Sequence, residues 1–218
     1  QNNFPLLQFG TWIGGDRDGH PLVTAEVTKS TLQKLRLNAF MLVKNELTNL
    51  AENLSFYSHL NAFPADINER FKAIVAEIGN AAKPVVAANR NEAFKLYVLL
   101  LIEKLPINRN KGEIFELAEH KGSYIHSAQL LADLELLKHA LNDYGVSVLA
   151  NNAVNRTLQL VKTFGFHLAK LDVRQNSSYY DKALAQMVNA IKTENARPNA
   201  WVYVDLKTSD IGGFVAEG

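Results

Sequence analysis

Hydrophobic residues recur every three or four positions along most of the first 163 residues, which is the spacing of one buried helix face. The longest such stretch predicts a single helix over about 24–54, with Thr24 as its N-cap and Glu26 at the positive end of the helix dipole. Its predicted inward positions are Val27, Leu32, Leu35, Phe40, Met41, Val43, Leu47, Leu50 and Leu54.

Shorter helices are predicted between the glycine and proline residues that end each one. The pattern places them at 66–78, 91–105, 127–145 and 154–163. Residues 81–89 are expected to form a loop because they contain a proline. The polar segment 108–122 is expected to touch the core only through Ile114, Phe115 and Leu117. The prediction is therefore a mainly α protein with a helical region over 24–163.

The hydrophobic period changes from 3.6 to two at 166–174, F-H-L-A-K-L-D-V-R, which predicts a strand. One strand face would hold Phe166, Leu168, Lys170, Asp172 and Arg174, apolar at its start and charged at its end. Parallel β/α barrels place their chemistry at the carboxyl ends of such strands. Ser178 and Asp181 form a predicted capping box for the next helix, so 164–193 is a candidate barrel strand plus helix. No assignment is made for 194–218, although 201–206 is a candidate second strand.

Composition narrows the classes of function. With 47% hydrophobic residues, the 218-residue chain can bury a core. Its 23 basic and 22 acidic residues give a net charge of +1, so we expect neither a nucleic-acid nor a membrane partner. The absence of cysteine favours a cytoplasmic location. The chain opens on Gln1 without an initiator methionine or a signal segment, which suggests an internal fragment of a longer protein.

The segment 11–21, T-W-I-G-G-D-R-D-G-H-P, holds three glycines, two aspartates and an arginine within positions 14–19. Glycines allow close backbone approach, and the flanking carboxylates can fix the arginine or hold it against a neighbour. A calcium loop of the EF-hand type is excluded, because counting from Asp16 puts Pro21 at the sixth position and Val27 at the twelfth. A functional loop and a structural turn both remain open.

The second polar segment is K-L-D-V-R-Q at 170–175. Three charges on one strand face are costly if they are buried without partners, so they either line a cavity or pair with one another. An ion network of Lys170, Asp172 and Arg174 on an exposed edge is the structural alternative. An arginine at a strand end, just before a helix N-terminus at Ser178, is also suited to bind phosphate or carboxylate.

Together the two segments resemble one family, phosphoenolpyruvate carboxylase, over about residues 4–190. The family's W-M-G-G-D-R-D-G-N-P followed by V-T stands here as W-I-G-G-D-R-D-G-H-P at 12–21 with V-T at 23–24. Its F-G-x-x-L-x-x-L-D-I-R-Q-E-S stands here at 164–177. The departures are His20 for asparagine, Asn176 for glutamate, and Tyr179-Tyr180 for an arginine-histidine pair. They indicate a divergent branch of the family and leave altered regulation or lost activity open.

The resemblance implies that the whole protein condenses phosphoenolpyruvate with bicarbonate to give oxaloacetate and phosphate, using Mg²⁺ or Mn²⁺. It further implies helices around a β-barrel, a homotetramer and allosteric regulation. Arg174 takes the role of binding the substrate phosphate. The glycine-rich loop 11–21 would border the active site through Trp12, Gly14, Gly15, Asp16, Arg17, Asp18 and Gly19.

Several of the family's catalytic parts have no counterpart in this sequence. The family's catalytic histidine lies upstream in a G-H-P-T-like motif, and its mobile loop and metal-binding glutamate and aspartate lie downstream. The six histidines here include no H-E-x-x-H pattern, so no metal site is expected in this chain. We therefore expect an inactive fragment of an active carboxylase. The alternative is a non-catalytic helical scaffold or subunit-interface module that keeps the motifs for packing.

Overall fold

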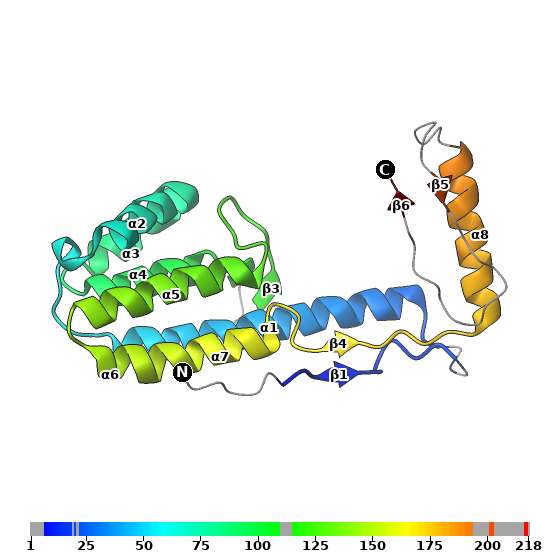
Figure 1. The fold of residues 1–218 in the computed structure, drawn as a ribbon, viewed down its shortest axis with the longest axis horizontal. Coiled ribbons are helices and arrows are strands. Elements are labelled where there is room, and N and C mark those ends of the chain that lie inside the picture. The colour runs from blue at the N-terminus through cyan, green and yellow to red at the C-terminus, as the bar shows by residue number, and fades with distance from the viewer. Residues whose placement is uncertain are drawn as a thin grey trace. The chain divides into compact units, whose positions relative to one another are not determined.

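The computed structural model describes residues 7–18, 20, 22–109, 115–193, 201–202 and 216–217. It is mainly helical, as predicted (Figure 1). The chain divides into two compact units, one formed by Gln1–Thr11 with Lys29–Lys170 and the other by Trp12–Thr28 with Leu171–Gly218. Here the first is called the helical unit and the second the motif unit.

Most of the helices belong to the helical unit. They are α1 (Ala25–Asn53), which begins in the motif unit, α2 (Ala65–Ile78), α3 (Ala82–Ala88), α4 (Ala93–Glu103), α5 (Ser127–Asp143), α6 (Ser147–Leu149) and α7 (Asn155–Phe164). Short 3₁₀ turns occupy Leu60–Ala62 and Gly79–Ala81, and a π-helical turn occupies Ala150–Val154. In Figure 1, α5 lies beside both α4 and α7.

The long first helix is confirmed, but only part of its apolar stripe is buried. The Thr24 hydroxyl oxygen accepts the N–H of Val27 at 3.3 Å, which is the predicted N-cap contact. From Phe40 onward the stripe enters the core, where it meets apolar residues of α2, α4, α5 and α7. The prediction is wrong in the first turns, because Val27 and Leu32 are 40% and 49% exposed.

A charge network lies within the helical unit. The guanidinium of Arg70 on α2 donates to both carboxylate oxygens of Asp133 on α5, at 2.6 and 3.0 Å, and to Glu77 at 2.8 Å. The Tyr124 hydroxyl donates to Asp133 at 2.6 Å, and Lys104 pairs with Glu77. The hydrogen bonds that Arg70 donates to Asp133 raise the pKa of Arg70, and burial raises the pKa of Tyr124 well above its usual value.

Two segments differ from the predicted loops. Residues 81–89 are largely helical, because Pro84 lies in the first turn of α3, where a backbone N–H has no intrahelical partner to lose. Within 108–122, β2 (Ile107–Arg109) pairs antiparallel with β3 (Phe115–Leu117), so a hairpin replaces the expected irregular segment. Leu117 packs on the core as predicted, while Ile114 lies outside the described residues.

The predicted strand over 166–174 is wrong in its first four residues. Phe166 is only 3% exposed, because its ring packs 4.7 Å from that of Phe40 in the helical core. Leu168 has φ 64° and its N–H donates to the carbonyl of Phe164 at 2.9 Å, which prolongs the turn that ends α7. The strand β4 covers Lys170–Leu171 alone and pairs with β1 (Gly10–Thr11).

The motif unit contains the last long helix, α8 (Ser177–Thr193). It begins one residue before the predicted cap, and Asn176 caps it instead of Ser178. The Asn176 side-chain oxygen accepts both the N–H and the hydroxyl of Ser178, at 3.0 and 2.9 Å. Farther on, β5 (Trp201–Val202) pairs antiparallel with β6 (Ala216–Glu217), and the rest of the candidate strand 201–206 lies outside the described residues.

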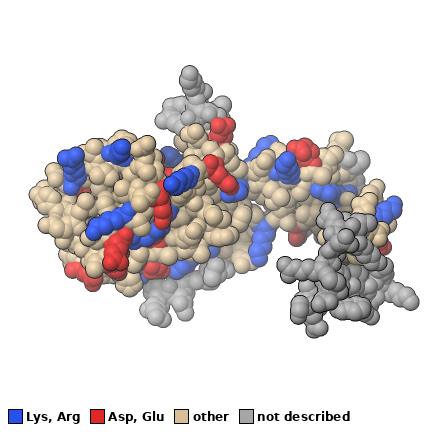
Figure 2. All heavy atoms as spheres, turned by 90° about the horizontal axis from the view of Figure 1, so that it is seen from above, with Lys and Arg blue, Asp and Glu red and all other residues tan. Residues whose placement is uncertain are grey.

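Charged side chains of both signs are mixed on the surface. On the face drawn in Figure 2, Lys and Arg side chains lie among Asp and Glu side chains. None of the helices in the described part of the chain combines the length and the apolar composition needed to cross a bilayer.

Candidate functional site

Backbone hydrogen bonds hold the two polar motif segments against each other in the motif unit. The N–H of Arg174 donates to the carbonyl of Gly15 at 2.9 Å, and the N–H of Arg17 donates to the carbonyl of Arg174 at 2.8 Å. Asp16 and Arg174 thereby form a parallel bridge. The structure thus brings together two segments that the sequence singled out separately.

Glycines make this close pairing possible. The N–H groups of Gly15 and Asp16 both donate to the carbonyl of Trp12, at 2.9 and 3.1 Å, and Gly14 turns the chain with φ 80°. A Cβ on Gly15 would lie 2.1 Å from the carbonyl oxygen of Asp172. Gly19, the third glycine of the predicted site, lies outside the described residues.

The side chains of Trp12, Asp172 and Arg174 form one contiguous cluster. The indole N–H of Trp12 donates to the Asp172 carboxylate at 3.1 Å. The guanidinium carbon of Arg174 lies 4.6 Å from the centre of a Trp12 ring, the geometry of a cation–π contact. Lys170 donates instead to the side-chain oxygen of Gln8 at 2.9 Å. Asp172 and Arg174 thus share Trp12 as their partner while Lys170 has another, so among the described residues the three charges do not form the ion network that was the structural alternative.

Arg17 is directed to the first turn of α1. Its Nη2 donates to the hydroxyl oxygen of Thr28 at 2.8 Å, and that hydroxyl donates to the carbonyl of Gly14 at 2.7 Å. Thr28 is buried, so it fixes the loop to the helix that follows. Of the two roles considered for the arginine, being held against a neighbour is the one observed. No local pattern points to this role of Thr28, which lies within the predicted helix 24–54 but off its apolar stripe.

An open hollow of about 560 Å³ borders this cluster. Its lining consists of Asp16, Asp18, Val173, Arg174, Gln175 and Tyr180. The Tyr180 hydroxyl donates to the carbonyl of Val173 at 3.1 Å, which sets the phenol beside Arg174. The hollow offers one guanidinium, two carboxylates, a carboxamide and a phenol. Tyr180 drew notice in the sequence only as a departure from the family pattern.

A metal centre needs several His, Cys, Asp or Glu side chains close together. Among the residues that the structure describes, no three such side chains gather closely enough to hold a metal ion. Two carboxylates, those of Asp16 and Asp18, line the same hollow as Arg174.

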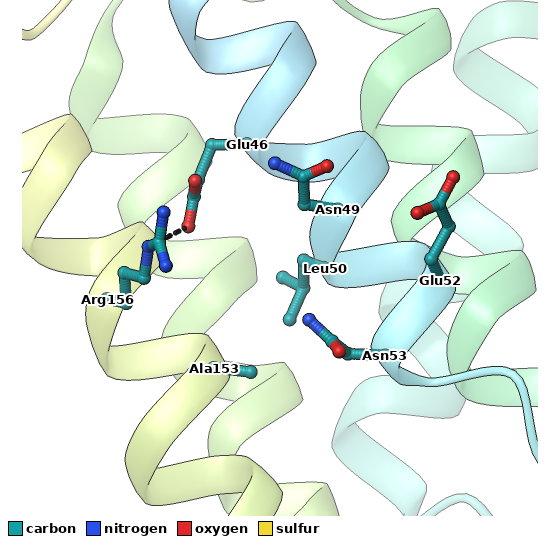
Figure 3. A pocket seen from close by; sticks show the side chains of 7 residues that line it. All are labelled: Glu46, Asn49, Leu50, Glu52, Asn53, Ala153 and Arg156. Atoms are coloured by element: carbon teal, nitrogen blue, oxygen red, sulfur yellow. Dashed lines mark ion pairs between the residues drawn. The ribbon is translucent and has the colours of Figure 1, made fainter.

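A second hollow, of about 320 Å³, lies in the helical unit on α1 and the start of α7 (Figure 3). Its lining consists of Glu46, Asn49, Leu50, Glu52, Asn53, Ala153 and Arg156. Glu46, with a side chain only 9% exposed, pairs with Arg156 at 3.1 Å, although the arginine side chain is 76% exposed. This pair connects α1 to α7, and the lining of the hollow includes none of the candidate site residues predicted from the sequence.

Comparison with known proteins identifies the family. A family model described as phosphoenolpyruvate carboxylase matches residues 1–202. The chain belongs to the phosphoenolpyruvate carboxylase family. It is 34% identical over 187 residues to the phosphoenolpyruvate carboxylase of Rhodopseudomonas palustris strain BisA53, covering 84% of this chain and 19% of that protein. The corresponding protein of Methylorubrum extorquens is 35% identical over 183 residues, covering 83% of this chain and 19% of its own.

The matches cover most of this chain but only a small part of each relative. The phosphoenolpyruvate carboxylase of Pseudomonas aeruginosa is 30% identical over 189 residues, which is 85% of this chain and again 19% of the relative. The chain therefore spans about a fifth of the length of the curated relatives that it matches. Both paired motif segments lie inside the matched residues.

Proposed function

We propose that the protein containing this chain is a phosphoenolpyruvate carboxylase that condenses phosphoenolpyruvate with bicarbonate to give oxaloacetate and phosphate. Family membership supports the reaction class. The observation that carries the proposal is the position of Arg174. Its backbone is bonded to Gly15 and Arg17 of the glycine-rich loop, and its side chain lines the open hollow.

Arg174 is proposed to bind the phosphate of phosphoenolpyruvate. A planar guanidinium donates two parallel hydrogen bonds to phosphate oxygens, a geometry that an ammonium group does not reproduce. It also stabilises the charge that develops as the phosphoryl group leaves. Asp16 and Asp18 line the same hollow but would repel a phosphate. We assign them to orienting the loop and cationic neighbours. We propose that they form the rim of the site together with Trp12, Gly14, Gly15, Arg17 and Gly19.

The remaining parts of the reaction are assigned to the rest of the protein. Mg²⁺ or Mn²⁺ would supply Lewis-acid stabilisation of developing negative charge, held by carboxylates outside this chain. The catalytic histidine is likewise placed outside it. We further propose that β4 extends a β-barrel completed by the remaining polypeptide. The whole protein would be a cytoplasmic, allosterically regulated homotetramer that feeds the tricarboxylic acid cycle.

The test uses the full-length protein with Arg174→Lys. Losing a charge-assisted hydrogen bond costs on the order of 1.5–3 kcal/mol, or roughly a ten- to hundredfold loss in kcat/KM for phosphoenolpyruvate. Arg156→Lys is the matched control, since Arg156 is an exposed arginine of the helical unit. Arg174 is structural if its variant stays within twofold of wild type in kcat/KM.

The same measurement separates the carboxylase from the scaffold alternative. A full-length protein that folds normally but forms no oxaloacetate from phosphoenolpyruvate, bicarbonate and Mg²⁺ would support a non-catalytic scaffold. In that case Arg174→Lys should lower the melting temperature if the residue serves packing alone.

A further inference from the structure

We infer that Asp172 is a positioning residue for Arg174 and acts through the indole of Trp12. This inference rests on the proposed function, because it concerns the guanidinium assigned to the substrate phosphate. Asp172 accepts the indole N–H at 3.1 Å, and the same indole presents a ring to the guanidinium at 4.6 Å. Asp172 itself touches no substrate in this scheme.

The need for such a device follows from the exposure of Arg174. The paired backbone fixes the α-carbon of Arg174, but its long side chain is exposed and has several rotatable bonds. Packing therefore does not select one rotamer. The ring of Trp12 does, because a guanidinium is attracted to an aromatic face. Trp12 is itself 56% exposed, so its ring also requires a contact that fixes its rotation.

The indole hydrogen bond provides that contact. It defines the edge of the ring that faces Asp172, and so defines where the face lies under Arg174. It also occupies the carboxylate. Residues two apart on an extended segment share a face, so Asp172 is within reach of Arg174 along the chain. Among the described residues, however, the Asp172 carboxylate bonds to the indole N–H and the Arg174 guanidinium lies against a ring of the same indole, and the two charged groups are not paired with each other.

The arrangement makes a specific prediction about coupling. Removing the carboxylate frees the ring, and replacing the indole by a phenyl ring removes the N–H while an aromatic face remains. If both act through one relay, the second change adds nothing to the first. Two independent structural roles would instead give effects that multiply.

The experiment is a double-mutant cycle in the full-length protein with Asp172→Ala, Trp12→Phe and the double variant. For each we would measure KM for phosphoenolpyruvate, kcat, and the inhibition constant of inorganic phosphate. We expect Asp172→Ala to raise KM for phosphoenolpyruvate and the phosphate constant about three- to tenfold. KM for bicarbonate should stay unchanged in this variant. The double variant should match the more affected single variant.

Asp172→Asn is the conservative control, because its side-chain oxygen still accepts the indole N–H. It should stay within about twofold of wild type. An Asn variant as impaired as the Ala variant overturns the relay, since charge rather than the hydrogen bond would then be responsible. Effects of Asp172→Ala and Trp12→Phe that multiply, or an Asp172→Ala variant with unchanged phosphate constants, overturn it as well.

The outcomes separate this inference from the proposed function. An active wild type in which Asp172→Ala leaves the phosphoenolpyruvate KM unchanged refutes the relay and leaves the function standing. A wild type that forms no oxaloacetate refutes the function, and the relay is then measured by the dissociation constant of inorganic phosphate. A wild type that forms no oxaloacetate and also binds no inorganic phosphate refutes both.

Discussion

The backbone of Gly15 passes so close to that of Asp172 that no side chain fits between them. A Cβ would meet the Asp172 carbonyl oxygen at 2.1 Å and its carbonyl carbon at 3.0 Å. Both are backbone atoms of a segment that is hydrogen-bonded in place, so neither can move aside without breaking the pairing. The glycine-rich loop can therefore pair with the segment that carries Arg174 only if residue 15 has no side chain.

Gly15→Ala is expected to disrupt the site without unfolding the helical unit. A backbone forced out of place costs about 1–3 kcal/mol, and we expect kcat/KM of the full-length protein to fall at least tenfold or so. Steady-state kinetics and thermal unfolding would measure the two effects. The matched control is Gly10→Ala, where the nearest atom lies at 3.8 Å, an ordinary contact. Equal kinetics for both variants would refute the steric argument.

Single residues also show which parts of the candidate site could be predicted from the sequence. The glycine-rich loop and Arg174 were predicted from local composition, and the structure pairs their backbones, while their joint role in one site stays a prediction. The contact of Trp12 with Asp172 spans 160 positions and has no local signature. The same holds for Arg17 and Thr28, because a threonine in the first turn of a helix is unremarkable until the loop folds onto it. Roles carried by distant pairs were therefore missed.

The helices were predicted well where the apolar period was the only pattern in the segment. Helix positions followed the apolar period, and Gly79, Gly145 and Gly165, which follow α2, α5 and α7, have positive φ. The prediction failed at 166–169, where alternation suggested a strand. There the ring of Phe166 packs against Phe40 in the core, and Leu168 adopts a left-handed backbone conformation that does not occur within a strand. Tertiary packing thus overrode a local period of two.

Asp133→Asn is expected to destabilise the helical unit strongly. The substitution removes the carboxylate that both Arg70 and Tyr124 bond, at a site only 2% exposed. Breaking a buried ion pair from one side costs about 3–5 kcal/mol. Urea unfolding monitored by circular dichroism would measure it. Glu135→Gln on the same helix is the control, since its pair with Lys162 at 3.5 Å is largely exposed and should contribute less than about 1 kcal/mol.

Alkaline pH should unfold the helical unit through its buried tyrosines. Burial, followed by the effect of the Asp133 carboxylate, raises the pKa of both Tyr97 and Tyr124. The pKa of these tyrosines is therefore higher in the folded state than in the unfolded state, where it is about 10. The stability that their protonated form contributes is complete below about pH 10 and is lost as the pH rises above that value. The folded state binds more protons there, so the unfolding free energy falls with pH. Tyrosinate absorbance should lag for these two of the seven tyrosines until the unit unfolds. Normal titration of all seven in the folded chain would contradict this.

At the scale of the whole molecule, α1 belongs to both units. Its first four residues, of which Thr28 is the last, lie in the motif unit, and its remainder lies in the helical unit. Leu32, on the predicted stripe, is exposed although the pattern places it inward. An apolar stripe reflects what a helix buries in the complete protein, and this chain spans about a fifth of its relatives. We expect the remaining polypeptide to cover these turns, which no argument from this chain alone could reveal.

The chain by itself is expected to show no carboxylase activity. Proton transfer and Lewis-acid stabilisation need a histidine and metal ligands that we assign to the rest of the protein. The roles that we propose for Arg174 and the loop are binding and orientation, and binding without the reacting groups gives no turnover. A coupled assay for oxaloacetate with phosphoenolpyruvate, bicarbonate and Mg²⁺ would test this, with the full-length protein as the positive control. Circular dichroism must show a helical fold in the same sample. Turnover above the buffer blank that survives repurification would mean that the missing groups are present in these 218 residues.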